Sequence, residues 1–127
     1  MNSYDMRQIF IWIYIYGYVN TQKIIENIDL DEFAELVKKH KDKLVVGAHA
    51  LDHLSMAQRK IYTEDKLTSP VLRERPTGVG LQKNGRYAVF YKRDNGYLKL
   101  IIALTDIGSL EIVTFINPAD KPYLERL

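Results

Sequence analysis

The stretch between residues 84 and 117 constrains the possible fold more than any other part of the chain. It holds three runs rich in Val, Ile, Tyr and Phe, at about 86–93, 97–105 and 110–116. Two compact turn sequences separate the runs, one ending at Gly96 and the other centred on Gly108. Glycine at such places supplies the positive φ that tight hairpins require. We therefore expect an antiparallel meander of three strands.

The middle run is apolar on both of its faces. Ile101 and Ala103 lie on one face, and the other is formed by Leu98, Leu100, Ile102 and Leu104. A strand of this kind is covered on both sides or lies in the middle of a curled sheet. For the third run, strict alternation predicts one face made of Leu110, Ile112, Thr114 and Ile116, with Phe115 facing the other way.

Residues 9–16, IFIWIYIY, admit two interpretations. Isoleucines alternate strictly with aromatic residues, and this period favours a strand. The context favours a helix over 6–16, because Thr21 can cap a short helix reaching Asn27 and a second helix follows. That arrangement resembles a helix-turn-helix. The run is shorter than the roughly 20 residues of a membrane span, and no small-residue cleavage site follows it, so neither a span nor a signal peptide is predicted.

The second helix is predicted to begin at Asp29 and to end near Lys41. Glu32 follows Asp29 at the spacing of a capping box, and an apolar stripe includes Phe33 and Val37. The cations that follow suit the C-terminal end of a helix dipole.

The length of 127 residues predicts a single domain over 1–127, with an N-terminal helical part at 1–45 and a helix plus sheet at 46–127. The net charge is +2. Residues 1–48 hold 6 Lys and Arg against 7 Asp and Glu, while residues 49–127 hold 12 against 9. This tilt is compatible with a polyanionic partner but does not demonstrate one. The absence of cysteine excludes disulfides and thiolate chemistry.

A short strand over Leu44 to Gly47 is expected to lead into a helix from His49 to Ile61. On that helix His49 and His53 lie one turn apart on the face that the core does not need, flanked by Asp52 and Arg59. Three interpretations stand side by side: acid–base catalysis by the imidazoles, a zinc site with i, i+4 histidines, and an exposed polar face. The chain offers no second histidine pair and no cysteine, so we expect no metal and no cofactor.

Beyond this helix, Thr63 is predicted to cap a further turn, and Pro70 to begin a short helix ending before Pro76. Arg73 and Arg75 on that segment could contact phosphate. The segment from Val79 to Lys83 is expected to begin the sheet as an edge strand.

The order of these motifs resembles the small ribonuclease toxins of the barnase–EndoU–colicin–RelE superfamily, most closely its phage-associated and RelE/BrnT-like branches. The resemblance covers about residues 45–117. It is carried by His49-Ala50-Leu51, His53, Arg59-x-Ile61, Val71-Leu72, Pro76, Gly85-Arg86-Tyr87, Tyr91, Leu98-Lys99-Leu100 and Ile112-Val113-Thr114-Phe115.

The resemblance implies an α+β fold in which N-terminal helices pack on a curved antiparallel sheet of three to five strands. It also implies metal-independent RNA cleavage by attack of the ribose 2′-OH, which leaves 2′,3′-cyclic phosphate ends. The implied partners are RNA and an antitoxin protein or a second copy of the chain, in the cytoplasm and with no membrane.

Roles are carried over by position. The implied catalytic residues are His49 and His53 as base or acid, Arg59, Arg86 or Lys92 as the cation, and Thr114 as a phosphate donor. The implied substrate-binding residues are Tyr87 and Tyr91 on a base and Arg73 and Arg75 on phosphate.

A second hypothesis is a non-catalytic nucleic-acid-binding or protein-interaction module with a helix-turn-helix-like N-terminus. Its recognition helix would be residues 29–41. That helix begins with acidic residues, among them Asp29, Asp31 and Glu32, whereas base readout needs Arg, Asn or Gln near the helix start. The pattern favours packing or a protein contact for this helix.

Overall fold

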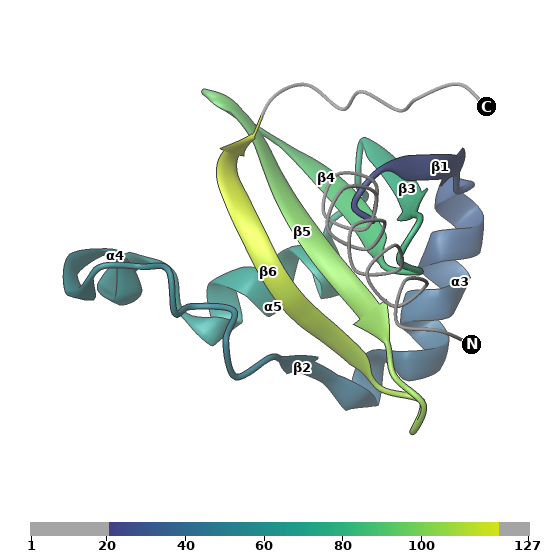
Figure 1. Cartoon of the computed structure of the whole chain (residues 1–127), viewed down its shortest axis with the longest axis horizontal. Helices are drawn as coiled ribbons and strands as arrows, with labels where there is room; N and C mark the ends of the chain where they lie inside the picture. Colours follow the sequence, from purple (N-terminus) through teal and green to yellow (C-terminus); the bar gives the residue numbers. More distant parts are fainter. Residues whose placement is uncertain (1–20, 120–127) are drawn as a thin grey trace, which may run out of the picture.

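Residues 21–119, which the computed structural model describes, form an α+β fold around one six-stranded mixed sheet (Figure 1). The strands are β1 (Ile24–Asn27), β2 (Leu44–Val46), β3 (Gly78–Gln82), β4 (Tyr87–Arg93), β5 (Gly96–Leu104) and β6 (Leu110–Ala119). The helices are α3 (Leu30–His40), the short 3-10 helix η2 (Lys41–Lys43), α4 (Met56–Ile61) and α5 (Glu64–Arg73).

The strands follow the order β1-β3-β4-β5-β6-β2. The predicted meander is confirmed, because β4, β5 and β6 pair antiparallel in sequence order. The turn glycines adopt the expected backbone, with φ of +145° at Gly96 and +78° at Gly108. The predicted strand after α3 is also confirmed as β2, which pairs parallel with β6, Leu44 opposite Leu110.

Three expectations about strands are wrong. The sheet was expected to be antiparallel with three to five strands, but it has six and is mixed, because β2 runs parallel to β6. β3 was expected at a sheet edge, but β1 pairs along its outer side, with Ile24 opposite Gln82. The expected faces of β6 hold only as far as Val113. The register with β5 shifts between Ile101 and Ile102, and this irregularity turns Phe115 into the core and leaves Ile116 exposed.

The predicted start of α3 is confirmed. The Asp29 carboxylate Oδ1 accepts hydrogen bonds from the backbone N–H groups of Asp31 at 2.8 Å and Glu32 at 3.1 Å. The predicted short helix ending at Asn27 is wrong, since those residues form β1. The helix-turn-helix interpretation therefore loses its middle helix, and its first helix over 6–16 lies outside the described residues.

The predicted helix from His49 to Ile61 exists only in its second half, as α4. Residues 47–55 form a loop of successive turns instead. Ser55 begins α4 with a capping box, in which its hydroxyl accepts from the Gln58 N–H and the Gln58 side chain accepts from the Ser55 N–H. This cap fixes the start of the helix at Met56, seven residues after His49.

The predicted cap at Thr63 is confirmed, and it begins α5. Pro70 was expected in the first turn of a helix but lies inside α5. Its missing N–H leaves one bond of that helix unmade.

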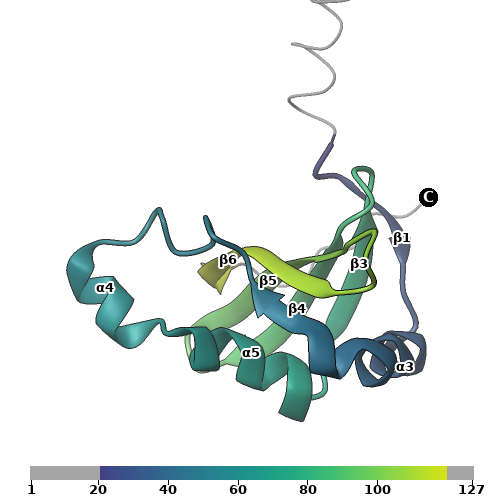
Figure 2. The ribbon, with the colours of Figure 1, turned by 90° about the horizontal axis from the view of Figure 1, so that it is seen from below.

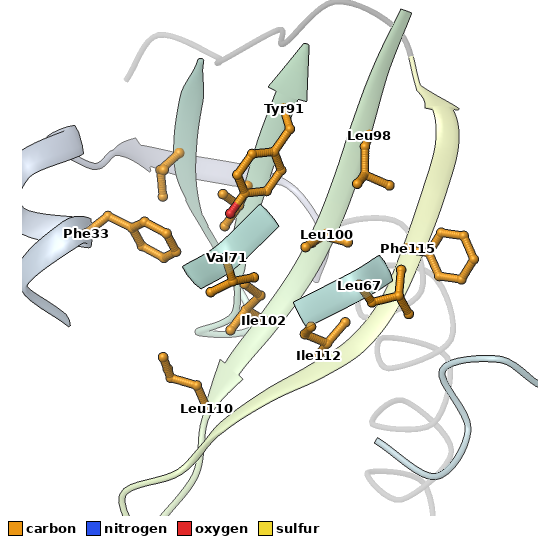
Figure 3. Close-up of a cluster of buried hydrophobic side chains, with 12 residues drawn as sticks. Phe33, Leu67, Val71, Tyr91, Leu98, Leu100, Ile102, Leu110, Ile112 and Phe115 are labelled. Atoms are coloured by element: carbon orange, nitrogen blue, oxygen red, sulfur yellow. The ribbon is translucent and has the colours of Figure 1, made fainter. Parts of the chain in front are cut away.

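Helices α3 and α5 lie on the same face of the sheet (Figure 2). Between them and the sheet lies the main core, in which Phe33 of α3 and Leu67 and Val71 of α5 meet the strands (Figure 3). The strand side chains of this core include Val89, Tyr91, Leu98, Leu100, Ile102, Leu110, Ile112 and Phe115. The opposite face carries a second apolar cluster of Ile24, Ala88, Phe90 and Ile101. Strand β5 is therefore apolar on both faces, as predicted.

Within residues 21–119, no helix is both long and apolar enough to cross a lipid bilayer.

Tyr91 buries a hydroxyl that has no hydrogen-bond partner among the described residues. Burial raises the pKa of this phenol far above its usual value, and the Glu74 carboxylate raises it further while Arg93 opposes the rise. Above about pH 10 the phenol ionises in the unfolded chain but not in the folded one. Unfolding then releases a proton, so the free energy of unfolding falls as the pH rises.

The expected result for Tyr91→Phe follows from this fall in the free energy of unfolding with rising pH. At pH 7 the variant is as stable as the wild type or more stable, because the partnerless hydroxyl is gone. Above about pH 10 its advantage grows by about 1.4 kcal/mol per pH unit. Urea unfolding of both proteins between pH 7 and pH 11 measures the difference in stability at pH 7 and its change with pH. A destabilised variant at pH 7 would show that the hydroxyl is hydrogen-bonded, and an alkaline slope equal to that of the wild type would show that the pKa of Tyr91 is not raised in the folded chain.

Gly80 of β3 lies directly beneath the side chain of Ile24. A Cβ added at Gly80 would come within 2.6 Å of Ile24 Cγ2. Gly80→Ala is therefore expected to lower the free energy of unfolding by about 1–3 kcal/mol. In a double-mutant cycle with Ile24→Ala, the losses of unfolding free energy in the two single variants should sum to more than the loss in the double variant. Additive losses would mean that the two residues do not touch.

Candidate histidine site

The loop of residues 47–55 and helix α4 project beyond the edge of the sheet (Figure 1). This segment carries His49, His53 and Arg59. Two features hold the start of this loop against the sheet. The Gly47 N–H donates to the Ile112 carbonyl oxygen of β6 at 2.9 Å, and the Ala50 side chain is completely buried. A Cβ at Gly47 would lie 2.7 Å from Glu111 Oε1 and 3.2 Å from the Ile112 carbonyl oxygen, so a larger residue there would require the Glu111 side chain to move. Strand β6 thus determines where the histidine loop begins.

His49 and Asp52 form a hydrogen-bonded pair, with 2.6 Å between His49 Nδ1 and Asp52 Oδ2. Arg59 Nη2 of α4 lies 3.8 Å from the other oxygen, Asp52 Oδ1. The His49 side chain is 90% exposed. When Nδ1 donates to the carboxylate, the neutral ring keeps its lone pair on Nε2. The arrangement leaves that nitrogen open to solvent and able to accept a proton.

The His53 side chain contacts the sheet on one side. Its ring packs on Phe115 of β6, with 5.1 Å between the ring centroids. Tyr62, the residue that ends α4, packs on the same ring at 5.0 Å. The Asn117 side-chain amide of β6 donates to the Tyr62 hydroxyl at 3.1 Å. Phe115 therefore joins the histidine loop and the end of α4 to one strand.

A groove of about 560 Å³ begins at Tyr62 and runs along α5. Lys66 of α5 and Asn117 of β6 contribute to its walls. Its far end is closed by Glu74 and Arg93, whose carboxylate and guanidinium meet through two hydrogen bonds of 2.9 Å each. This paired geometry holds both side chains in fixed positions. The groove offers polar and apolar contacts beside the histidine loop.

The other predicted catalytic residues lie elsewhere. Side chains alternate along β4, and Phe90 belongs to the cluster on the face opposite the helices. Lys92, two residues on, therefore lies on that same face. Its Nζ is 5.3 Å from the centroid of the Tyr97 ring. Phe115 and His53 are on the helix-covered face. Arg86 precedes β4, which is separated from β6 by β5. The structure does not bring Arg86 or Lys92 beside the histidines.

Thr114 is also absent from the histidine cluster. It pairs with Ile101, which faces the second apolar cluster. Its position follows from the register shift in β6.

The four predicted substrate-binding residues lie in other parts of the structure. Tyr91 is buried in the main core, so the expectation that it stacks on a base is wrong. Tyr87 is half-buried and packs against Phe33, with 6.0 Å between the ring centroids. Arg73 and Arg75 line a groove between α3 and α5.

The zinc interpretation finds no third ligand in residues 21–119, where no three His, Cys, Asp or Glu side chains are grouped in a way that could hold a metal ion. The third histidine, His40, ends α3, and its Nδ1 lies 2.7 Å from the Gly108 carbonyl oxygen. It belongs to the turn between β5 and β6, away from the loop.

Sequence reasoning missed Tyr62, Asn117, Glu74 and Arg93. Tyr62 and Asn117 are 55 residues apart in the chain, and no local pattern relates them. Arg93 immediately precedes the turn at Gly96, so its position at the end of β4 could have been foreseen, but its partner Glu74 could not.

A scan against protein-family models and searches of curated proteins and of solved structures found no match.

Replacing Phe115 tests the joint between the loop and the sheet. Phe115→Leu keeps an apolar side chain but removes the ring on which His53 packs. We expect the ring-proton resonances of His53 to move toward free-histidine values, because the Phe115 ring current is lost, while those of His40 stay in place. Proton NMR of the three histidines measures this. Unchanged His53 resonances would contradict the packing.

Proposed function

We propose that the chain is a metal-independent RNA endonuclease whose acid–base groups are carried by the histidine loop. The observation that supports the proposal most is the His49–Asp52 hydrogen bond with Arg59 on the other side of the carboxylate. A histidine held by a carboxylate, beside an arginine, is a set of groups able to move protons and to stabilise an anion.

In the proposed reaction His49 is the base. Its Nε2 removes the proton from a ribose 2′-OH while Asp52 fixes the tautomer through Nδ1. The 2′ oxygen then forms a bond to the adjacent phosphorus. The bond from phosphorus to the 5′ oxygen breaks, which leaves a 2′,3′-cyclic phosphate on one product.

His53 is proposed as the acid that gives its proton to the departing 5′ oxygen. Its contact with Phe115 orients the ring. The Arg59 guanidinium stabilises the negative charge on the pentacoordinate phosphorus. Protons balance over the step, because one is taken at His49 and one is given at His53.

The groove along α5 is the proposed place for RNA next to the cleaved bond. Tyr62 offers a half-buried ring for contact with a base, and Lys66 offers a cation for phosphate. The proposal places the protein in the cytoplasm, with RNA as its substrate and with an antitoxin protein or a second copy of the chain as its protein partner.

The test is cleavage of a mixed RNA in excess EDTA, followed by analysis of the product ends. We expect the wild type to produce 2′,3′-cyclic phosphates. His49→Ala and His53→Ala should each lower the rate by roughly 10²- to 10⁴-fold. A substrate with a single 2′-deoxyribose at the cleaved position should be resistant there, because it lacks the attacking oxygen.

Matched variants make this test specific. His40→Asn removes a histidine outside the loop, and Arg86→Gln and Lys92→Gln remove cations outside it; all three should cleave like the wild type. Cleavage that survives loss of both His49 and His53, or that needs Lys92 instead, would refute the assignment. No cleavage by the folded wild type would refute the activity.

A further inference from the structure

A second groove lies between α3 and α5, on the outer side of the two helices that cover the sheet. Its volume of about 520 Å³ falls within the roughly 300–1,000 Å³ usual for binding pockets. It is lined by residues along the length of α3, by the C-terminal end of α5 and by the segment that follows α5. The groove of the proposed RNA site is lined by an earlier part of α5 and shares only Glu74 with this one, so this groove has no role in the chemistry described above.

The floor of the groove is aliphatic. Leu30 and Val37 of α3 and Leu72 of α5 line it, with Phe33 and Val71 beneath. Leu72 is 48% exposed although it is a large apolar residue. Phe33 is only 2% exposed, so no aromatic face is open in the groove. Such a floor fits aliphatic side chains better than nucleic-acid bases, which bind by stacking.

The rim of the groove is cationic. Lys38, Lys41 and Arg73 stand on it, and none of the three has an ion pair with a carboxylate in residues 21–119.

The other charges of the groove are already compensated. Both carboxylate oxygens of Glu74 are taken by Arg93, and Arg75 is paired with Asp31 at 3.1 Å. The positive charge left on the rim therefore belongs to Lys38, Lys41 and Arg73.

We propose that this groove binds an acidic amphipathic helix of a partner protein. Aliphatic residues at i, i+3 or i+4, and i+7 of that helix lie on the floor between α3 and α5. Its glutamates and aspartates face Lys38, Lys41 and Arg73 across the rim. Two helices that present an apolar channel are completed by a third helix, and the charge of the rim selects an acidic one.

The probe is a fluorescein-labelled peptide of about 18 residues, long enough to form a helix. It carries Leu on one face and Glu and Ala elsewhere. We expect it to bind the full chain, as measured by fluorescence anisotropy, and to bind more weakly as salt is added. A matched peptide with every Glu replaced by Lys should not bind.

Charge reversal locates the site. The pair Lys41→Glu and Arg73→Glu should weaken binding at least tenfold, and Leu72→Asp should also weaken it. Lys92→Glu, on the opposite face of the sheet, is the matched control and should bind like the wild type. All changed side chains are exposed, so circular dichroism should show an unchanged fold.

The inference would be overturned if the acidic peptide did not bind, or if the charge-reversed variants bound it as well as the wild type does. It would also be overturned if those variants still bound the peptide but no longer bound a uridine oligonucleotide, because the rim would then bind nucleic acid. Self-association abolished by Leu72→Asp, without peptide binding, would assign the groove to a second copy of the chain instead. RNA cleavage measured on the same variants should be unchanged, so this test and that of the proposed activity fail separately.

Discussion

The burial of β5 on both faces is the constraint on which the rest of the structure depends. Leu98, Leu100 and Ile102 are enclosed under α5, while Ile101 belongs to the cluster on the other face. Removing apolar surface from water is the dominant favourable term in folding, and it holds β5 between β4 and β6. Strand β6 in turn carries β2 along its edge, and from β2 the chain enters the histidine loop. The position of the site at the sheet edge therefore depends on β5, a strand that contributes none of the proposed acid–base groups.

The parts of the fold that follow from local chemistry were predictable. Gly96 and Gly108 mark the turns of the meander, and Asp29 marks the start of α3. The parts that failed depend on distant partners. Strand β1 buries only Ile24 of its four residues, and its partner β3 lies more than 50 residues away in the chain. The shift in β6 that places Phe115 in the core leaves no trace in the alternation of the sequence.

The candidate site divides in the same way. His49, Asp52 and Arg59 are near one another in the chain and meet in the structure, although a loop brings them together rather than the expected helix. Arg86 and Lys92 were expected beside them, but which face of a sheet a residue takes depends on the register of every strand before it. Tyr62, Asn117 and the Glu74–Arg93 pair required the tertiary fold. Tyr91 was misassigned because a tyrosine in a strand looks the same in sequence whether it is buried or exposed.

Our central claim is that RNA meets this chain at the histidine loop. The most direct measurement is an NMR titration of the wild type with an RNA oligonucleotide in which every 2′-OH is methylated, so that it binds without being cleaved. The account predicts that the resonances of His49, His53 and Tyr62 shift together and saturate, while those of His40, Arg86 and Lys92 do not move. Shifts centred on Arg86 and Lys92 with a silent histidine loop would contradict it.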